Sequence, residues 1–186
     1  MADWWETLEE TRAEVWRRIT RGVADRRAPA RHPALATQGL DGFAEARVVV
    51  LRGADQEAAT LEIHTDTASA KVTELRAASG ATLLVWEEMA SLQIRLRCNI
   101  EIVEGEEAAA RWKLVPAGSR KVYGGDPPTG QPIDRPQDFT PTPDPDRFAV
   151  LTCKIAEIET VHLGREQHRR ALFRASDGWR GQWLVP

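Results

Sequence analysis

The first 28 residues carry the spacing of an amphipathic helix, with one apolar and one polar face. Large apolar side chains recur three or four positions apart, at Trp5, Leu8, Val15, Trp16, Ile19 and Val23. Asp3 can serve as the N-cap, because its carboxylate can accept a hydrogen bond from a free backbone N–H of the first turn. Since tryptophan stands where leucine would be enough, we expect this helix to cover a broad surface, either its own barrel or a second subunit.

The pattern then changes to short β-type segments. The run 46–51 is apolar on both faces, because Val48 and Val50 point one way and Val49 the other, so we expect a single strand that is covered on both sides. Residues 92–103 alternate over twelve positions, which makes them the clearest strand. Further strands are predicted at 34–37, 61–65, 82–86, 150–159, 171–174 and 179–184, and helices at 70–78 and 105–114. Six or seven closely spaced strands indicate a small, mostly antiparallel β-barrel with helical decoration.

Residues 116–145 contain most of the chain's 11 prolines and several glycines, which predicts an irregular crossing loop. A loop this long inside a compact domain is usually functional or mobile. We therefore divide the chain into an N-terminal amphipathic helix at 1–28 and one domain at 29–186 that includes the loop.

Composition and charge limit which partners and which kinds of site we expect. A net charge of −3 gives no overall positive field, so nucleic acid is not an expected partner. No apolar run approaches the ~20 residues of a membrane helix, and the acidic, aromatic N-terminus does not resemble a signal peptide, so we expect a cytoplasmic protein away from membranes. Cys98 and Cys153 lack the spacing of a zinc site or a disulfide framework, and both are expected to be small buried residues.

Phosphate-binding glycine loops are missing from the sequence. Basic and hydroxyl groups stand instead where strands meet a helix: Arg47 opens one strand, Thr65 ends another, and Ser69 and Lys71 lie where a helix begins. Because a helix N-terminus offers free N–H groups and a partial positive charge, these side chains could form a phosphate cradle. The alternative is that Ser69 only caps the helix and Lys71 is a solvated surface lysine.

Other chemistries have less support. His64, Asp66 and Ser69 lie close in sequence, but no G-x-S-x-G elbow accompanies them, which disfavours a hydrolase triad. His162 and His168 are six positions apart, a spacing that suits no common metal motif, so no metal is expected. The basic run 168–170 could hold an anionic ligand or form a solvated rim, and the sequence leaves both possibilities open.

Seven segments follow one another in a recognisable order: Ala36-Thr37, Arg47 to Arg52, Thr65 to Lys71, Trp86, Gln93 to Arg95, His168 to Arg170 and Trp179 to Pro186. In this order they resemble the pyridoxamine 5′-phosphate oxidase family, and more narrowly its uncharacterised FMN-binding branch, from about Pro33 to Pro186. The resemblance implies a six-stranded antiparallel split β-barrel that forms a homodimer and holds two FMN molecules between the subunits.

The resemblance also implies roles for individual residues. The cofactor-binding residues would be Arg47, Val48, Val49, Val50, His64, Thr65, Ser69, Lys71, Gln93 and Arg170. Substrate contacts would fall to Arg52, Ser119, Tyr123 and His168. In this scheme Lys71 and its hydroxyl neighbours bind the FMN phosphate, and Gln93 contacts the ring or ribityl edge.

Departures from the oxidases concern mainly the substrate. Ala70 stands where they have an arginine on the FMN phosphate, Arg52 where they have a lysine, and Glu166 where they have an arginine. The flavin site is therefore expected to be largely retained, while the vitamin B6 phosphate site is not. We expect an FMN-dependent oxidoreductase that acts on a small molecule, with a reduced nicotinamide, NADH or NADPH, as electron donor by analogy. The alternative is a flavin or heme carrier or sensor without turnover.

Overall fold

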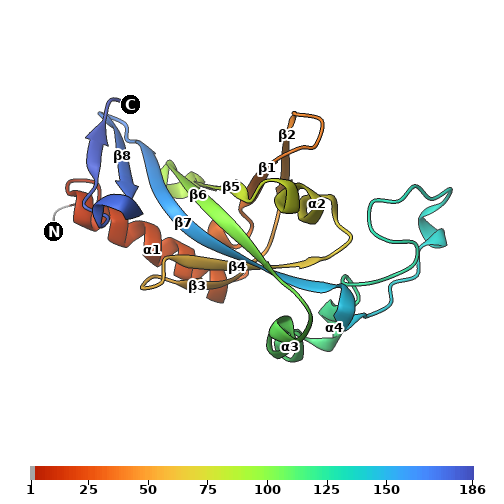
Figure 1. Ribbon diagram of the computed structural model, residues 1–186. Coiled ribbons are helices and arrows are strands. Elements are labelled where there is room, and N and C mark those ends of the chain that lie inside the picture. The colour runs from red at the N-terminus through yellow and green to blue at the C-terminus, as the bar shows by residue number, and fades with distance from the viewer. Residues whose placement is uncertain (1–2) are drawn as a thin grey trace.

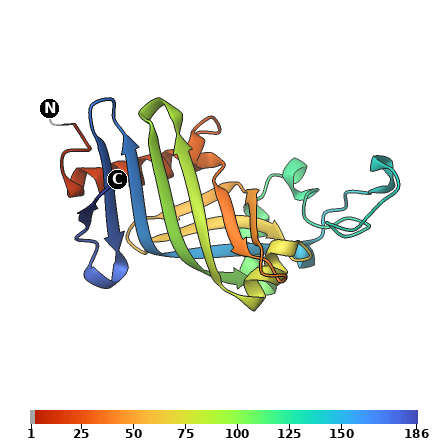
Figure 2. The same cartoon turned by 90° about the horizontal axis from the view of Figure 1, so that it is seen from above.

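A single curled sheet of nine strands forms the body of the protein in the computed structural model, which describes residues 3–186 (Figures 1 and 2). The strands are β1 Ala34–Gln38, β2 Ala44–Val48, β3 Leu51–Asp55, β4 Thr60–Asp66, β5 Gly80–Glu87, β6 Leu92–Val103, β7 Phe148–Leu163, β8 His168–Arg174 and β9 Gln182–Leu184. The helices are α1 Leu8–Ala24, α2 Ala70–Ala77, α3 Gly105–Leu114 and α4 Ala117–Arg120, with short 3-10 turns between elements. The prediction of an antiparallel barrel with connecting helices is confirmed, although the sheet has more strands than the six expected.

The barrel is split between two strands that are neighbours in the chain. The strands are ordered β2-β1-β5-β6-β7-β4-β3, with β8 on β7 and β9 on β8, so β2 and β3 lie at opposite ends of the main path. Only Val49 and Val50 connect them. In the part of the chain that the structure describes, β2 pairs with β1, β3 pairs with β4, and no ladder joins β2 to β3.

This arrangement corrects the prediction of one continuous strand at 46–51. The chain leaves the β2 ladder after Val48, whose side chain is 68% exposed, and Val49 turns inward with 7% exposed. The backbone N–H of Val49 donates to the carbonyl oxygen of Pro33 at 3.0 Å instead of joining a strand. The apolar side chains on both faces are explained by this crossing from one edge of the sheet to the other.

Helix α1 covers the barrel interior next to β3 and β8, as its apolar stripe predicts. Val15, Trp16 and Ile19 are almost fully buried against the core. The helix begins later than expected, because the hydroxyl of Thr7, and not Asp3, accepts a hydrogen bond from a first-turn N–H (Glu10, 3.2 Å). Trp5 precedes the helix and stacks on the ring of a buried histidine, His162, with 4.6 Å between ring centroids.

Two predicted elements, β6 and α3, have the expected bounds. Strand β7 is longer than expected, and its register against β6 shifts at a bulge beside Arg97 and Cys98. The basic run 168–170 opens β8. Both cysteine thiols are buried, and burial raises the pKa of Cys98 to about 12.

Residues 121–147 leave the barrel as an arm, which projects beside α2 in Figure 1. Two 3-10 turns, Pro136–Asp138 and Pro145–Arg147, are its regular structure, so the expected irregular segment is observed. Across residues 3–186, no helix has the length and hydropathy needed to cross a membrane.

The burial of α1 leads to a stability prediction. Trp16→Ala removes a large side chain that is 4% exposed and leaves a cavity, so we expect the free energy of unfolding to fall by about 3–5 kcal/mol in urea denaturation. Thr20→Ala on the exposed side of the same helix is the control and should change it by less than ~0.5 kcal/mol. Equal effects of the two substitutions would show that α1 is not part of the core.

Candidate functional site

A pocket of about 290 Å³ lies at the split in the barrel, and we call it the split pocket. Its walls come from the β2–β3 connection, the end of β4, the start of α2 and the root of the arm. The lining residues are Arg47, Val48, Val49, Val50, Arg52, His64, Thr65, Asp66, Ser69, Lys71, Val122, Tyr123 and Thr129. Eight of the ten residues expected to bind the cofactor therefore meet here, together with two of the four expected to bind substrate.

Hydroxyls and an ammonium group converge at the start of α2. The Ser69 hydroxyl donates to the carbonyl oxygen of Asp66 at 2.7 Å and lies 3.1 Å from the Thr65 hydroxyl oxygen. Lys71 donates to that same Thr65 oxygen at 3.2 Å. Ser69 occupies the N-cap position but makes no side-chain cap hydrogen bond, so its hydroxyl is directed toward the pocket cluster and not to the helix backbone.

Lys71 is a half-buried cation. Across residues 3–186 it forms no ion pair with a carboxylate. Burial lowers its pKa, and so does the neighbouring charge of Arg47, whereas Glu74 and Asp66 act in the opposite direction. Because an anion would stabilise the protonated form, this ammonium group is suited to a phosphate ligand.

Arg47 is less free than the sequence suggested. Its guanidinium group pairs with the buried carboxylate of Glu74 at 2.8 Å and also donates to the Thr37 hydroxyl. Thr37 donates in turn to Glu74 at 2.5 Å. Arg47 thus connects β2 to α2. Because the Glu74 carboxylate offsets its charge, the positive charge that a ligand would meet in the pocket comes mainly from other groups. No role in the site was predicted for Thr37 or Glu74, although Glu74 is three positions after Lys71, a spacing that places both on one side of a helix.

The far end of the pocket holds a second available cation. The Nε atom of Arg52 is buried without a hydrogen-bond partner, and its guanidinium group forms no ion pair within the described chain. Burial raises the pKa of the nearby Tyr123 phenol, an effect that Arg52 opposes. His64 lies 2.9 Å from a carboxylate oxygen of Glu62 and lowers the pKa of that carboxyl group.

Arg52 and His64 also line an adjoining hollow of about 270 Å³ between α1 and α3. Arg31 and Arg111 lie on its wall, and burial together with repulsion from Arg52 lowers the pKa of Arg31. The two hollows form one positively charged region on the outside of β3 and β4.

These groups fit the cofactor that the resemblance implies. FMN ends in a phosphate ester, and the split pocket offers hydroxyls from Thr65 and Ser69, the unpaired ammonium group of Lys71 and the N-terminus of α2. The buried unpartnered Nε of Arg52 marks a place for another polar group of a ligand.

Four expected site residues lie elsewhere. Gln93 and Arg170 are on the outer face of the sheet, where both are next to Val161 in the strand register. Arg170 pairs with the buried carboxylate of Glu159 at 3.0 Å. His168 is exposed at the start of β8, and Ser119 lies on α4.

The pocket also contains residues that the sequence analysis left out. Asp66 accepts hydrogen bonds from Arg147 and from the backbone of Gly124, which ties the arm to the pocket. Val122 and Thr129 of the arm complete the lining. Only the turn-forming run 66–69 gave a local signal for this arrangement. Among residues 3–186, no group of three or more His, Cys, Asp or Glu side chains is placed to hold a metal.

Comparisons with known proteins identify similar sequences over part of the chain. Residues 13–104 match the family model described as pyridoxamine 5′-phosphate oxidase, FMN-binding domain. Over 86 residues the chain is 36% identical to the pyridoxine/pyridoxamine 5′-phosphate oxidase of Thermosynechococcus vestitus, and over 87 residues it is 38% identical to that of Rhizobium meliloti. These matches cover 46% and 47% of this chain but only 40% and 41% of the two relatives.

Solved structures share the fold over most of the chain. A pyridoxamine 5′-phosphate oxidase-related, FMN-binding protein of Nostoc punctiforme superposes with a TM-score of 0.77 at 21% identity, covering 100% of this chain and 99% of that one. PhzG of Burkholderia lata, solved with tetrahydrophenazine-1-carboxylic acid, gives 0.73 at 23% identity over 95% and 91%. A heme binding protein of Mycobacterium smegmatis gives 0.50 at 19% identity over 81% and 55%. The chain is thus similar to the pyridoxamine 5′-phosphate oxidase-like, FMN-binding split-barrel family in sequence over residues 13–104 and in fold over most of its length, and its cofactor is FMN.

Proposed function

We propose that this protein is an FMN-dependent oxidoreductase that acts on a small molecule and works as a homodimer, with FMN bound between the subunits. The observation that carries the proposal is the split pocket, where Lys71 and Arg52 face a ligand-sized hollow without carboxylate partners in residues 3–186. Bound FMN would supply hydride transfer, which the side chains of this pocket do not.

The size of the split pocket supports a shared site. At about 290 Å³ it lies just below the ~300–1,000 Å³ that ligand pockets usually enclose. Val48 lines it and is 68% exposed, so the pocket opens directly onto the outer face of the sheet. Part of a flavin held by Lys71 would therefore extend beyond this subunit, and a second copy would have to cover it.

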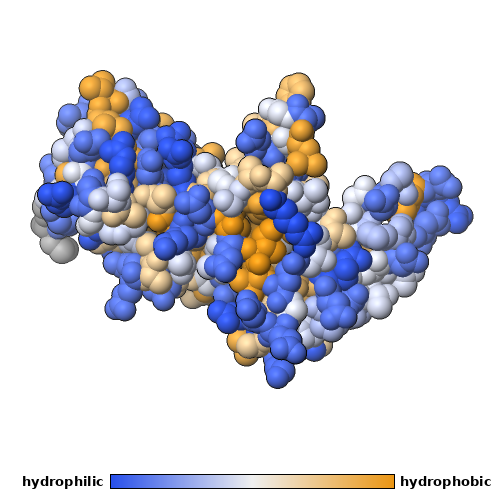
Figure 3. All heavy atoms as spheres, in the orientation of Figure 1, coloured by the Kyte–Doolittle hydropathy of each residue, from blue (hydrophilic) through white to orange (hydrophobic). Residues whose placement is uncertain are grey.

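The outer face of the sheet has the character of a surface that a second copy covers. Val48, Ala34 and Leu84 follow one another across β2, β1 and β5, and Trp86 lies further along β5. Leu84 and Trp86 are 38% and 46% exposed. The β1–β2 hairpin adds Leu40 and Phe43, which are 69% and 74% exposed. Figure 3 shows hydrophobic surface on the projection that this hairpin forms in Figure 1. Exposed apolar side chains that lie next to one another in this way are typical of a surface that binds another protein.

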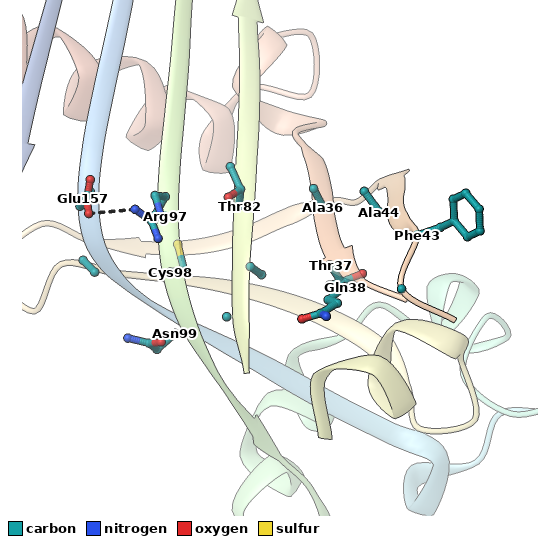
Figure 4. A pocket seen from close by; sticks show the side chains of 14 residues that line it. Ala36, Thr37, Gln38, Phe43, Ala44, Thr82, Arg97, Cys98, Asn99 and Glu157 are labelled. Atoms are coloured by element: carbon teal, nitrogen blue, oxygen red, sulfur yellow. Dashed lines mark hydrogen bonds and ion pairs between the residues drawn. The ribbon is translucent and has the colours of Figure 1, made fainter. Parts of the chain in front are cut away.

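A groove of about 590 Å³ runs across the same face (Figure 4). Small side chains, Ala36, Ala44 and Thr82, line one side, and the ion pair of Arg97 with Glu157 at 3.1 Å lies on the other. Gln93 and Arg170 belong to this outer face. In a homodimer they would contact the flavin in the pocket of the other subunit, which accounts for their distance from Lys71.

In the proposed enzyme, side chains of the split pocket carry out the remaining tasks. Thr65, Ser69 and Lys71 bind the phosphate and fix the cofactor, while Arg52 and Tyr123 face the space left for substrate. Arg52 would hold an anionic or polar group of that substrate. NADH or NADPH is the proposed electron donor, and a second copy that covers the pocket would exclude water from the reacting atoms.

Binding without turnover is the second candidate function, as a flavin or heme carrier or sensor. The observation in its favour is that the pocket offers few free proton donors, since His64 is held by Glu62 and burial raises the pKa of Tyr123. An enzyme that only transfers a hydride needs no such donor, so this observation does not displace the first candidate.

Lys71→Ala tests the phosphate contact. Loss of a charge-assisted hydrogen bond of about 1.5–3 kcal/mol should raise the dissociation constant for FMN roughly 10- to 100-fold, measured by quenching of flavin fluorescence. Lys154→Ala, which removes an exposed lysine on β7, is the matched control and should leave it unchanged. An unchanged dissociation constant for FMN in Lys71→Ala would show that the ammonium group of Lys71 faces solvent and not the phosphate.

Anaerobic reduction distinguishes the two candidate functions. FMN-loaded protein should lose its flavin absorbance when NADH or NADPH is added without oxygen, and it should recover on addition of an oxidised small-molecule acceptor. A flavin that stays oxidised with every reductant would support the carrier, and a colourless protein that ignores excess FMN would contradict both.

Leu84→Glu tests the dimer. A carboxylate at the centre of the apolar face should convert a particle of twice 20.8 kDa into a monomer on light scattering and weaken FMN binding with it. Leu114→Glu, on α3 and 81% exposed, is the control and should remain dimeric. A wild-type monomer that binds FMN tightly would contradict the shared site.

A further inference from the structure

We propose that the carboxylate of Asp66 is a positioning group that couples the phosphate cradle to the arm, so that a bound cofactor phosphate holds the arm over the split pocket. This inference rests on the proposed placement of the FMN phosphate at Thr65, Ser69 and Lys71. It adds a role to residues 121–147, which neither the family match nor the cofactor accounts for.

Asp66 organises the cradle on one side. It directly follows Thr65, and its Oδ1 atom accepts a hydrogen bond from the backbone N–H of Ala68 at 2.8 Å. The carbonyl oxygen of Asp66 accepts the Ser69 hydroxyl at 2.7 Å. This turn therefore sets the position of both hydroxyls and of the α2 N-terminus relative to Lys71.

The same carboxylate holds both ends of the arm. Its Oδ2 atom accepts the backbone N–H of Gly124 at 2.8 Å, and its Oδ1 atom accepts Nη2 and Nε of Arg147 at 2.8 and 3.1 Å. The N–H of Thr67 donates to the carbonyl oxygen of Arg147 at 2.8 Å. Asp66 is 6% exposed, so these contacts form in a place where an unpaired carboxylate would be costly.

The root of the arm is built tightly. Asp144 donates its N–H to the carbonyl oxygen of Tyr123 at 2.9 Å, and Asp126 forms an antiparallel bridge with Thr140. Gly124 has a φ of +107°, and a Cβ atom there would lie 2.3 Å from the carbonyl oxygen of Thr142. Only glycine fits this position, so the two sides of the root move together.

The arm returns to the pocket beyond this root. Thr129 beyond the root lines the split pocket together with Val122 and Tyr123 at the root, and Tyr123 packs edge-on against Phe148 with ring centroids 5.0 Å apart. A phosphate that orders Ser69 and Lys71 also orders the turn at Asp66, and through it the arm. The reverse holds by linkage, because an arm that is anchored at Asp66 favours the bound state of the cradle.

Asp66→Asn removes a negative charge and also the hydrogen bonds to the arm, and these two changes predict opposite effects on FMN affinity. Asp66 is an anion next to the phosphate site, so removing its charge should by electrostatics alone tighten the binding of FMN. The amide would, however, place an NH2 group against the N–H of Gly124 or the guanidinium group of Arg147, which detaches the arm. The coupling therefore predicts weaker binding.

The experiment measures FMN affinity together with hydrogen exchange of the full-length protein, with and without FMN. In the wild type, FMN should slow exchange about tenfold in residues 122–129 and 139–147. In Asp66→Asn the dissociation constant should rise about tenfold, and FMN should no longer protect the arm. Asp138→Asn near the arm tip, where the carboxylate pairs only with exposed Arg135, makes the same charge change and should behave as wild type.

Gly124→Ala gives an independent variant in case Asp66→Asn does not fold. It disrupts the root without changing a charge and should show the same loss of arm protection and of affinity. Tighter FMN binding in Asp66→Asn, or wild-type arm exchange that ignores FMN, would overturn the coupling while leaving the cofactor in place. A wild type that binds no FMN would contradict the cofactor site itself, and coupling without turnover would contradict only the proposed enzyme activity.

Discussion

The fold depends on one connection: two residues, Val49 and Val50, carry the chain from one edge of the sheet to the other. A barrel that closed fully would pair β2 with β3 and leave no space between them. Because the two strands stay apart, the end of β4 and the N-terminus of α2 reach the opening from inside, and the outer face meets it at Val48. The site is thus a product of incomplete closure.

Electrostatics then divides the basic residues that could bind an anionic ligand into two groups. Arg47, Arg147 and Arg170 each pair with a buried carboxylate, from Glu74, Asp66 and Glu159 respectively. These pairs fix the positions of β2, the arm and β8. Lys71 and Arg52 have no such partner in the described chain, and they are the cations that remain for a ligand. Counting basic residues in the sequence cannot separate the two groups, because the pairing partners lie far away in the chain.

The sequence predicted what depends on local pattern. Alternation over residues 92–103 gave β6 with the correct bounds, and the pattern of 105–114 gave α3. Strand β7 extends beyond the predicted 150–159 at both ends, because its ends pair with β4 and β8, and this pairing is not visible in the local pattern. The break after Val48 could not be predicted, since an exposed valine in sequence looks the same as a buried one and its exposure follows from the packing of distant strands.

The arm has a rigid base and an open end. At the base, Gly124 and Gly125 bring two chain segments so close that no larger residue fits, while near the tip Gly130 has open space around it. Insertions that the base would reject can therefore be accommodated at the tip. A fluorophore or a short affinity tag placed there would report on the position of the arm without disturbing the barrel.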